Sequence, residues 1–172
     1  MKLRLAKEDF ALSIDFGISR FVVAKIVKTW INFMYFEFQE LDFWPSRDVI
    51  DEHFPSNFKE MFPKTRVILD ATEVPIQRPK HCDSQRITFS TYKNRNTLKT
   101  MIGISPRGQV TYVSPSYGGS ASDRQMFERS PLVKEPLFLP ADSIMSDRWI
   151  MVQDLFSNKD VRVNTLNYNE GL

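Results

Sequence analysis

The sequence predicts an α/β fold that follows an all-helical N-terminal module. Apolar residues recur at helical spacing over the first 43 positions, whereas short apolar runs that end in carboxylates dominate after residue 66. The 172 residues are 42% hydrophobic and 26% charged, an ordinary globular balance that argues against disorder of the whole chain. We therefore expect a helical module over 1–43, a linker over 44–65 and an α/β domain over 66–172.

The helical module has the pattern of two helices joined by a short turn. A short helix is expected over residues 7–15, and Phe16-Gly17-Ile18-Ser19 interrupts it. Serine is a common helix cap, and apolar residues recur at helical spacing from Val23 to Met34. This layout is typical of a helix-turn-helix, with a plain helical hairpin as the alternative. The candidate DNA contacts on the second helix are Arg20, Lys25 and Lys28.

Strand and helix patterns alternate after residue 65. The apolar run from Thr65 to Leu69 predicts a buried strand with Asp70 at its end. Strands over 97–104 and 110–114 flank a turn and should form a hairpin. A short helix through Phe127, a strand over 142–146 that ends at Asp147, and a further helix from 153 follow. This is the opening order of a ribonuclease-H-like fold, in which the first and the fourth strand are neighbours.

Three aspartates stand where this topology can bring carboxylates together. Asp70 and Asp147 end predicted strands, and Asp123 begins the short helix. Aspartate supplies the oxygen ligands that hard divalent cations need, and two such cations stabilise the attacking and leaving oxygens of a phosphoryl transfer. Asp70 and Asp147 are the preferred pair. For Asp123 the alternative is a capping charge at a helix N-terminus.

Positive charge is concentrated between residues 74 and 108. Seven Lys or Arg and a single Asp lie there, although the net charge of the whole chain is only +2. Phe89 and Tyr92 stand among these cations. Such a basic strip beside carboxylates suits a nuclease, because cations bind phosphates, whereas a solvated strand face protected by its charges is the alternative. The candidate DNA contacts here are Lys93, Arg95 and Lys99.

The counts of cysteine and histidine exclude several classes. Cys82 is the only cysteine, so an internal disulfide is excluded and a reducing compartment is favoured. With only two histidines, a zinc finger is excluded as well. No apolar run approaches the roughly 18 residues that a membrane helix needs, and charges interrupt the N-terminus too early for a signal peptide. We expect an intracellular protein without a membrane span.

Five motifs occur in order along the α/β part of the chain: Phe62 to Glu73, Tyr92 to Lys99, Ile102 to Pro106, Tyr117 to Asp123, and Ser146 to Arg148. Together they resemble the DDE superfamily endonuclease domain of eukaryotic Harbinger-like transposases. The N-terminal module is similar to the helix-turn-helix that precedes this domain, in Phe16 to Ser19 and in Thr29 to Phe33. The resemblance extends from about residue 5 to about residue 165.

The resemblance implies a ribonuclease-H-like catalytic core that cuts and joins DNA with Mg²⁺ or Mn²⁺. The acidic triad of the family consists of two aspartates and a glutamate. Asp70 matches the first aspartate. Asp147 is preferred as the second, and Asp123 lies in a motif that the family also carries. DNA as a partner and a nuclear location follow from the resemblance in the same way. A homo-oligomer or a partner chain is left open as a further partner.

The C-terminal part departs from the family pattern. The glutamate of the family lies on a helix well beyond the last motif, and Glu170 is a poor substitute because it has no helical context. Trp149 stands where the family has glycine. We therefore expect a C-terminally truncated endonuclease domain. The alternatives are a catalytically inactive DNA-binding remnant, which acts through the helix-turn-helix and the basic strip, and a protein-interaction module.

Overall fold

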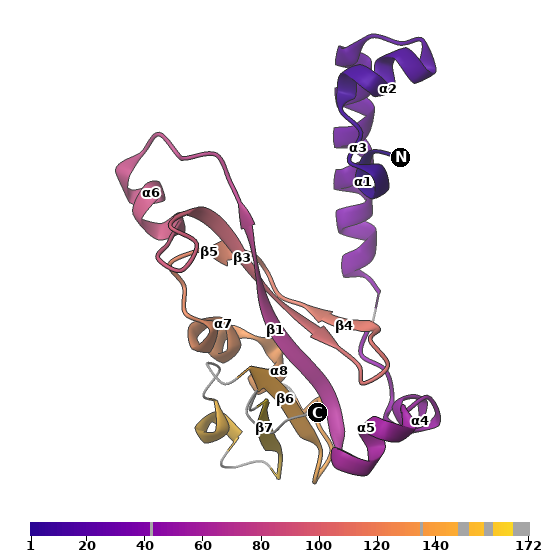
Figure 1. Ribbon diagram of the computed structural model, residues 1–172, viewed down its shortest axis with the longest axis vertical. Helices are drawn as coiled ribbons and strands as arrows, with labels where there is room; N and C mark the ends of the chain where they lie inside the picture. Colours follow the sequence, from indigo (N-terminus) through magenta and orange to yellow (C-terminus); the bar gives the residue numbers. More distant parts are fainter. Residues whose placement is uncertain (42, 135, 148–151, 157–159, 167–172) are drawn as a thin grey trace. The chain divides into compact units, whose positions relative to one another are not determined.

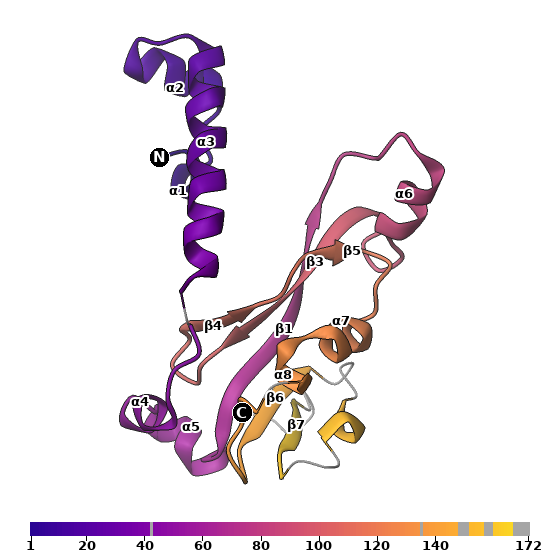
Figure 2. The same ribbon diagram turned by 180° about the vertical axis from the view of Figure 1, so that it is seen from behind.

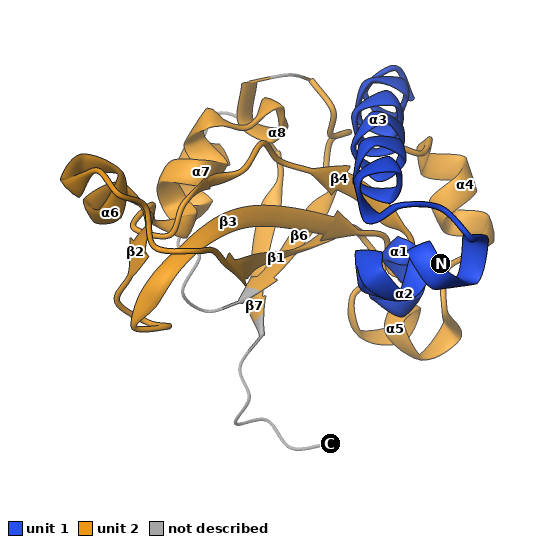
Figure 3. Cartoon of the chain, turned by 90° about the horizontal axis from the view of Figure 1, so that it is seen from above, with its two compact units in different colours: residues 1–42 blue, residues 43–172 orange. Residues whose placement is uncertain are grey.

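The computed structural model describes residues 1–41, 43–134, 136–147, 152–156 and 160–166 (Figures 1 and 2). The chain divides into two compact units, residues 1–42 and 43–172 (Figure 3). The first unit is all-helical, and the second is a mixed α/β unit built on a curled mixed sheet. The expectation of an α/β class is thereby confirmed. Trp149 and Glu170 lie outside the described residues.

The first unit contains α1 (Lys2–Leu5), α2 (Asp9–Phe16) and α3 (Arg20–Gln39). Gly17 ends α2 with a φ of 63°, a conformation that glycine adopts without strain. The Ser19 hydroxyl then accepts the Val22 amide at 3.3 Å and caps α3. The predicted interruption and cap at residues 16–19 are confirmed. No helix in the described part of the chain combines the length and the apolar character that a membrane crossing needs.

The second unit begins before the sheet, in the segment that we expected to be a linker. Residues 44–65 contain α4 (Arg47–Glu52) and α5 (Ser56–Met61). Ser46 caps α4 by accepting the Val49 amide at 3.4 Å. The prolines that suggested a linker lie outside these two short helices, where a missing amide donor costs least.

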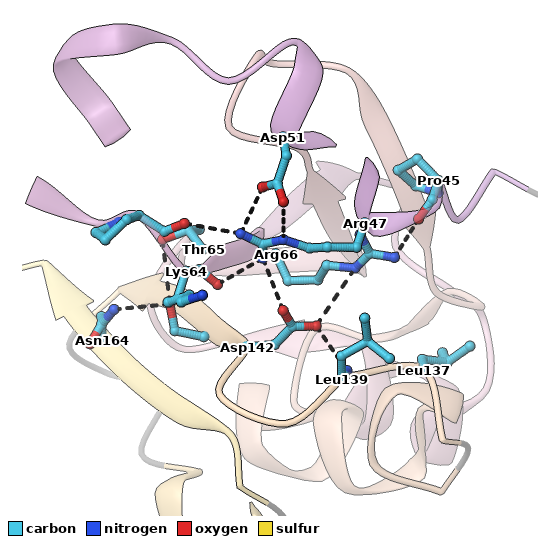
Figure 4. A network of polar contacts seen from close by, with 12 residues as sticks. Pro45, Arg47, Asp51, Lys64, Thr65, Arg66, Leu137, Leu139, Asp142 and Asn164 are labelled. Carbon is cyan, nitrogen blue, oxygen red and sulfur yellow. Dashed lines mark hydrogen bonds and ion pairs between the residues drawn. The ribbon is translucent and has the colours of Figure 1, made fainter. Parts of the chain in front are cut away.

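A buried ion-pair network attaches α4 to the sheet (Figure 4). Arg47 donates to Asp142 at 2.9 Å, to Asp51, and to the carbonyl oxygens of Pro63 and Lys64. Asp142 and Arg66 are only 3% and 4% exposed, with 3.9 Å between a carboxylate oxygen and Nε of the guanidinium. These charges hold the segment before the first strand against the loop before the strand at Ser143.

The sheet has the strand order β2-β3-β1-β6-β7. These strands are β2 (Phe89–Ser90), β3 (Arg95–Ile104), β1 (Thr65–Pro75), β6 (Ser143–Asp147) and β7 (Arg162–Leu166). Strands β1 and β3 are antiparallel, whereas β6 pairs in parallel with both β1 and β7. Two further strands, β4 (Val110–Val113) and β5 (Tyr117–Gly118), pair with β3. The predicted hairpin over 97–114 is therefore confirmed.

The core of the second unit lies between the sheet and its short helices. Those helices are α7 (Asp123–Arg129), α8 (Pro131–Lys134) and the 3₁₀ helix η1 (Gln153–Phe156), whereas α6 (Cys82–Thr88) follows β1. Leu69, Met101 and Ile144 of the sheet are buried together with Phe127 and Phe156 of the helices. A capping box with Ser122 starts α7. The predicted helix through Phe127 is confirmed.

Candidate functional site

The parallel pairing of β1 and β6 brings Asp70 and Asp147 to the same level of the sheet. Its last registered pair is Leu69 with Ser146, so the two aspartates are the next residue on each strand. Neighbouring strands lie about 4.7–4.9 Å apart. The expectation that the first and the fourth predicted strand are neighbours is confirmed by this pairing.

The prediction that Asp70 ends its strand is wrong. Strand β1 continues for five more residues and pairs with β3 as far as Pro75, which lies opposite Thr97. Asp70 therefore marks the point where β1 loses β6 as a partner but keeps β3. The side chain of Asp70 is exposed, and one of its oxygens accepts the amide of Ala71 at 2.8 Å.

A separate acidic cluster surrounds Lys99. The Lys99 ammonium lies 3.3 Å from an oxygen of Glu73 and 3.2 Å from an oxygen of Asp123. Thr97 also donates to Glu73 at 2.9 Å. Burial raises the pKa of Glu73, but the hydrogen bonds from Ser90, Thr97 and Lys99 and the positive charge of Lys99 outweigh it, so this pKa lies below its ordinary value.

Asp70 and the Lys99 cluster lie on opposite faces of the sheet. Alternate residues of a strand face opposite sides, and β1 pairs with β3 without a register shift from Ile68 to Pro75. Glu73 shares the face of the buried Leu69, whereas Asp70 is on the other face. Asp123, which is tied to Glu73 through Lys99, belongs to the Leu69 face. The structure brings the backbones of Asp70 and Asp147 together and does not bring Asp123 beside Asp70.

The described residues contain no group of three or more His, Cys, Asp or Glu side chains placed to hold a metal ion. Two carboxylate-bearing positions at one level of adjacent strands nevertheless suit a hard cation. The Lys99 cluster suits one less well, because an ammonium group already forms ion pairs with both Glu73 and Asp123. Of the two arrangements, the Lys99 cluster is therefore the poorer candidate for a cation site.

The candidate DNA contacts divide into exposed and engaged residues. Arg20, Lys25 and Lys28 are exposed on α3. Lys93 and Arg95 are exposed at the turn into β3, and Lys93 lies over the ring of Tyr92 at 4.6 Å. Lys99, in contrast, is 14% exposed and is held by its two carboxylates. The ion pairing of Lys99 could not be predicted from the sequence, because its contact with Glu73 depends on the register of β1 and β3.

Comparisons with known proteins give one match. A family model described as DDE superfamily endonuclease matches residues 69–168. No curated protein and no solved structure matches the chain. The matched range begins one residue before Asp70 and includes Asp123 and Asp147.

Proposed function

Because this chain belongs to the DDE superfamily endonuclease family, we propose that it is a transposase-like nuclease domain in which Asp70 and Asp147 hold a divalent cation. The single observation that carries the assignment of these two residues is their common level on paired parallel strands. In a parallel pair, positions at the same level share a face of the sheet. We further propose that the sheet is the core of a ribonuclease-H-like domain of the Harbinger-like type.

The chemistry follows from the oxygen atoms that the aspartates offer. A bound Mg²⁺ or Mn²⁺ supplies Lewis-acid polarisation of a phosphodiester and activation of the attacking oxygen. Asp70 contributes an exposed carboxylate, of which one oxygen is oriented by the Ala71 amide at 2.8 Å. Its backbone lies in a strand that is paired with β3, so the carboxylate stands on a rigid element. DNA is the substrate that the family implies.

Nicking of supercoiled plasmid DNA tests the proposal. We expect nicking with Mg²⁺ or Mn²⁺ and its loss in Asp70→Asn and in Asp147→Asn. Asp48→Asn is the matched control, because Asp48 is an exposed carboxylate on α4. Nicking that survives Asp70→Asn refutes the assignment. Nicking that survives Asp147→Asn but is lost in Asp123→Asn refutes the assignment of Asp147 as the second ligand.

A metal-binding measurement gives a readout that does not depend on nicking. Calorimetric titration with Mn²⁺ should show binding to the wild-type chain and to Asp48→Asn, and no binding to Asp70→Asn. Equal Mn²⁺ binding by all three proteins would contradict the role of Asp70 as a ligand. This comparison separates loss of metal from loss of DNA contact.

A second candidate function is DNA binding by the first unit without cleavage. The specific observation is the pair α2 and α3 around Gly17, with exposed cations at the start of α3. We propose that these helices are a helix-turn-helix whose contacts are Arg20, Lys25 and Lys28. Duplex binding that weakens steeply with salt supports this function. Duplex affinity that is unchanged when all three cations are replaced by Gln refutes it.

A further inference from the structure

A basic hollow lies at the end of the sheet beyond Pro75. It is open to solvent and has a volume of about 810 Å³ between the segment that follows β1, helix α6 and the turn that connects β2 with β3. This volume lies within the range of small-molecule sites in proteins. The residues of its lining that matter here are Arg78, Gln85, Arg86, Phe89, Arg95 and Asn96.

The lining carries three guanidinium groups and no carboxylate. Arg86 has Asp83 as a neighbour at 3.9 Å, but these side chains are 83% and 90% exposed, so solvent screens the pair. No carboxylate forms an ion pair with Arg78 or Arg95 within the described part of the chain. The hollow therefore has a positive potential.

Gln85 orients Arg78 without neutralising it. Its side-chain oxygen accepts two hydrogen bonds from the guanidinium, from Nε at 2.9 Å and from Nη2 at 2.7 Å. The amide nitrogen of Gln85 donates to the carbonyl oxygen of Pro79 at 2.9 Å and so fixes the loop that carries Arg78. A neutral amide holds the cation in place and leaves its charge for an anion.

The walls of the hollow are tied to one another by Asn96. The Asn96 side chain is buried and donates to the carbonyl oxygen of Gln85 at 2.9 Å and to the hydroxyl of Thr88 at 2.8 Å. Its backbone carbonyl accepts the amide of Ile76 at 2.9 Å. These bonds connect α6, β3 and the segment after β1, so the hollow is formed before a ligand arrives.

The chemistry of the lining selects its ligand. Guanidinium groups bind phosphate oxygens with paired hydrogen bonds. Phe89 adds an aromatic ring that is 39% exposed, and exposed aromatic rings stack unpaired bases. An inorganic phosphate would use the arginines alone. We propose that this hollow binds one nucleotide of an unpaired DNA strand, with its phosphodiester at Arg78, Arg86 and Arg95 and its base against Phe89.

This inference rests on the proposed function, since DNA is the substrate that the nuclease family implies. Ile76 lies six residues beyond Asp70, just past the end of β1 at Pro75, and is at most about 20 Å from it at the usual rise per residue. The hollow is therefore a contact for DNA away from the cleaved bond, separate from the aspartates.

The test is fluorescence anisotropy with a fluorescein-labelled ten-nucleotide oligothymidylate, the full chain and EDTA. We expect Arg95→Gln to weaken binding by about tenfold and to lower the slope of log K against log salt by about 0.7. Arg107→Gln is the matched control, because Arg107 is exposed in the turn between β3 and β4. Equal losses in Arg95→Gln and Arg107→Gln would overturn the proposal. Arg86→Gln repeats the test at a side chain that is 83% exposed, where folding is not at risk.

An abasic oligonucleotide of the same length tests the base. The wild-type chain should bind it several-fold more weakly than oligothymidylate, and Phe89→Ala should bind both equally. Equal affinity of the wild-type chain for oligothymidylate and the abasic oligonucleotide would refute the stacking of a base on Phe89. Displacement of oligothymidylate by an equal concentration of inorganic phosphate would refute it as well. Because EDTA removes the metal, a chain that binds in this way but never nicks DNA supports the hollow and refutes only the proposed cleavage.

Discussion

Removal of the Asp142 carboxylate should destabilise the second unit severely. In Asp142→Ala, Arg47 loses its 2.9 Å partner and the Leu139 amide loses the acceptor at 2.9 Å. Arg66 keeps its charge in a site where it is 4% exposed, with Nε and Nη1 already lacking hydrogen-bond partners among the described residues. Loss of one partner from a buried ion pair costs about 3–5 kcal/mol, against a total of about 5–15 kcal/mol for a domain.

The pKa of Arg66 also indicates that Asp142→Ala destabilises the second unit. Burial lowers the pKa of this guanidinium, and the Asp142 charge opposes that effect. Without the negative charge of Asp142, burial lowers the pKa of Arg66 further. The charged side chain then has no buried carboxylate to offset its desolvation, which is the physical origin of the expected loss.

Asp51→Ala is the matched control. Asp51 is the other carboxylate partner of Arg47, at 2.8 Å, but its side chain is 46% exposed. A pair of that exposure contributes about 1 kcal/mol or less. The two variants therefore remove the same chemical group from the same arginine and differ mainly in burial.

Urea denaturation followed by far-ultraviolet circular dichroism measures both variants. With an m-value of about 2 kcal/mol/M, Asp142→Ala should lower the midpoint by about 1.5–2.5 M and Asp51→Ala by about 0.5 M or less. Fluorescence of Trp44, whose ring lies 5.3 Å from the Arg66 guanidinium, reports the same region. Equal midpoint shifts in the two variants would refute the reasoning from burial.

Three further predictions concern packing and pH. A Cβ at Gly118 would overlap the carbonyl oxygen of Ile87, so Gly118→Ala should cost about 1–3 kcal/mol, and an unchanged melting temperature would contradict this. Burial raises the pKa of Tyr112 to about 12, while an unfolded tyrosine ionises near pH 10. The unfolding free energy should therefore fall as pH rises from about 10 to 12. The variant Tyr112→Phe should remove this fall. The pKa of Glu73 lies below its ordinary value of 4.5. The stability that ionised Glu73 contributes is therefore present above that pH and is lost as pH falls through the lower pKa of the folded state. The urea midpoints at pH 7 and pH 3.5 should differ less in Lys99→Met than in the wild type.

The sequence predicted features whose signals are local. The glycine and serine at residues 17 and 19 identify the end of one helix and the start of the next, because their conformational and capping preferences act within a few residues. The neighbouring levels of Asp70 and Asp147 could be predicted as well, because two apolar runs each end in an aspartate and a known topology makes these strands neighbours.

Features that depend on contacts between residues far apart in the sequence could not be predicted from it. Polar residues after Leu69 suggested that β1 ends, yet pairing with β3 carries it to Pro75. The helix at Arg47 is attached by Asp142, which lies 95 positions away. The contact of Lys99 with Glu73 likewise requires the register of β1 and β3, which pairs these two residues across 26 positions of sequence. No window of local sequence contains these pairings.

The central position of β1 in the sheet also determines the order in which its two strand pairings can form during synthesis. Its antiparallel partner β3 follows soon in the chain, but Ser143 of the parallel partner follows Thr65 by 78 positions. At about 5–20 residues per second, synthesis needs roughly 4–16 s to supply that partner. During this interval one edge of β1 offers unpaired amide and carbonyl groups, which are a template for other chains. Long-range parallel pairing is also slow to form, so we expect this edge of nascent chains to be a site of misassembly.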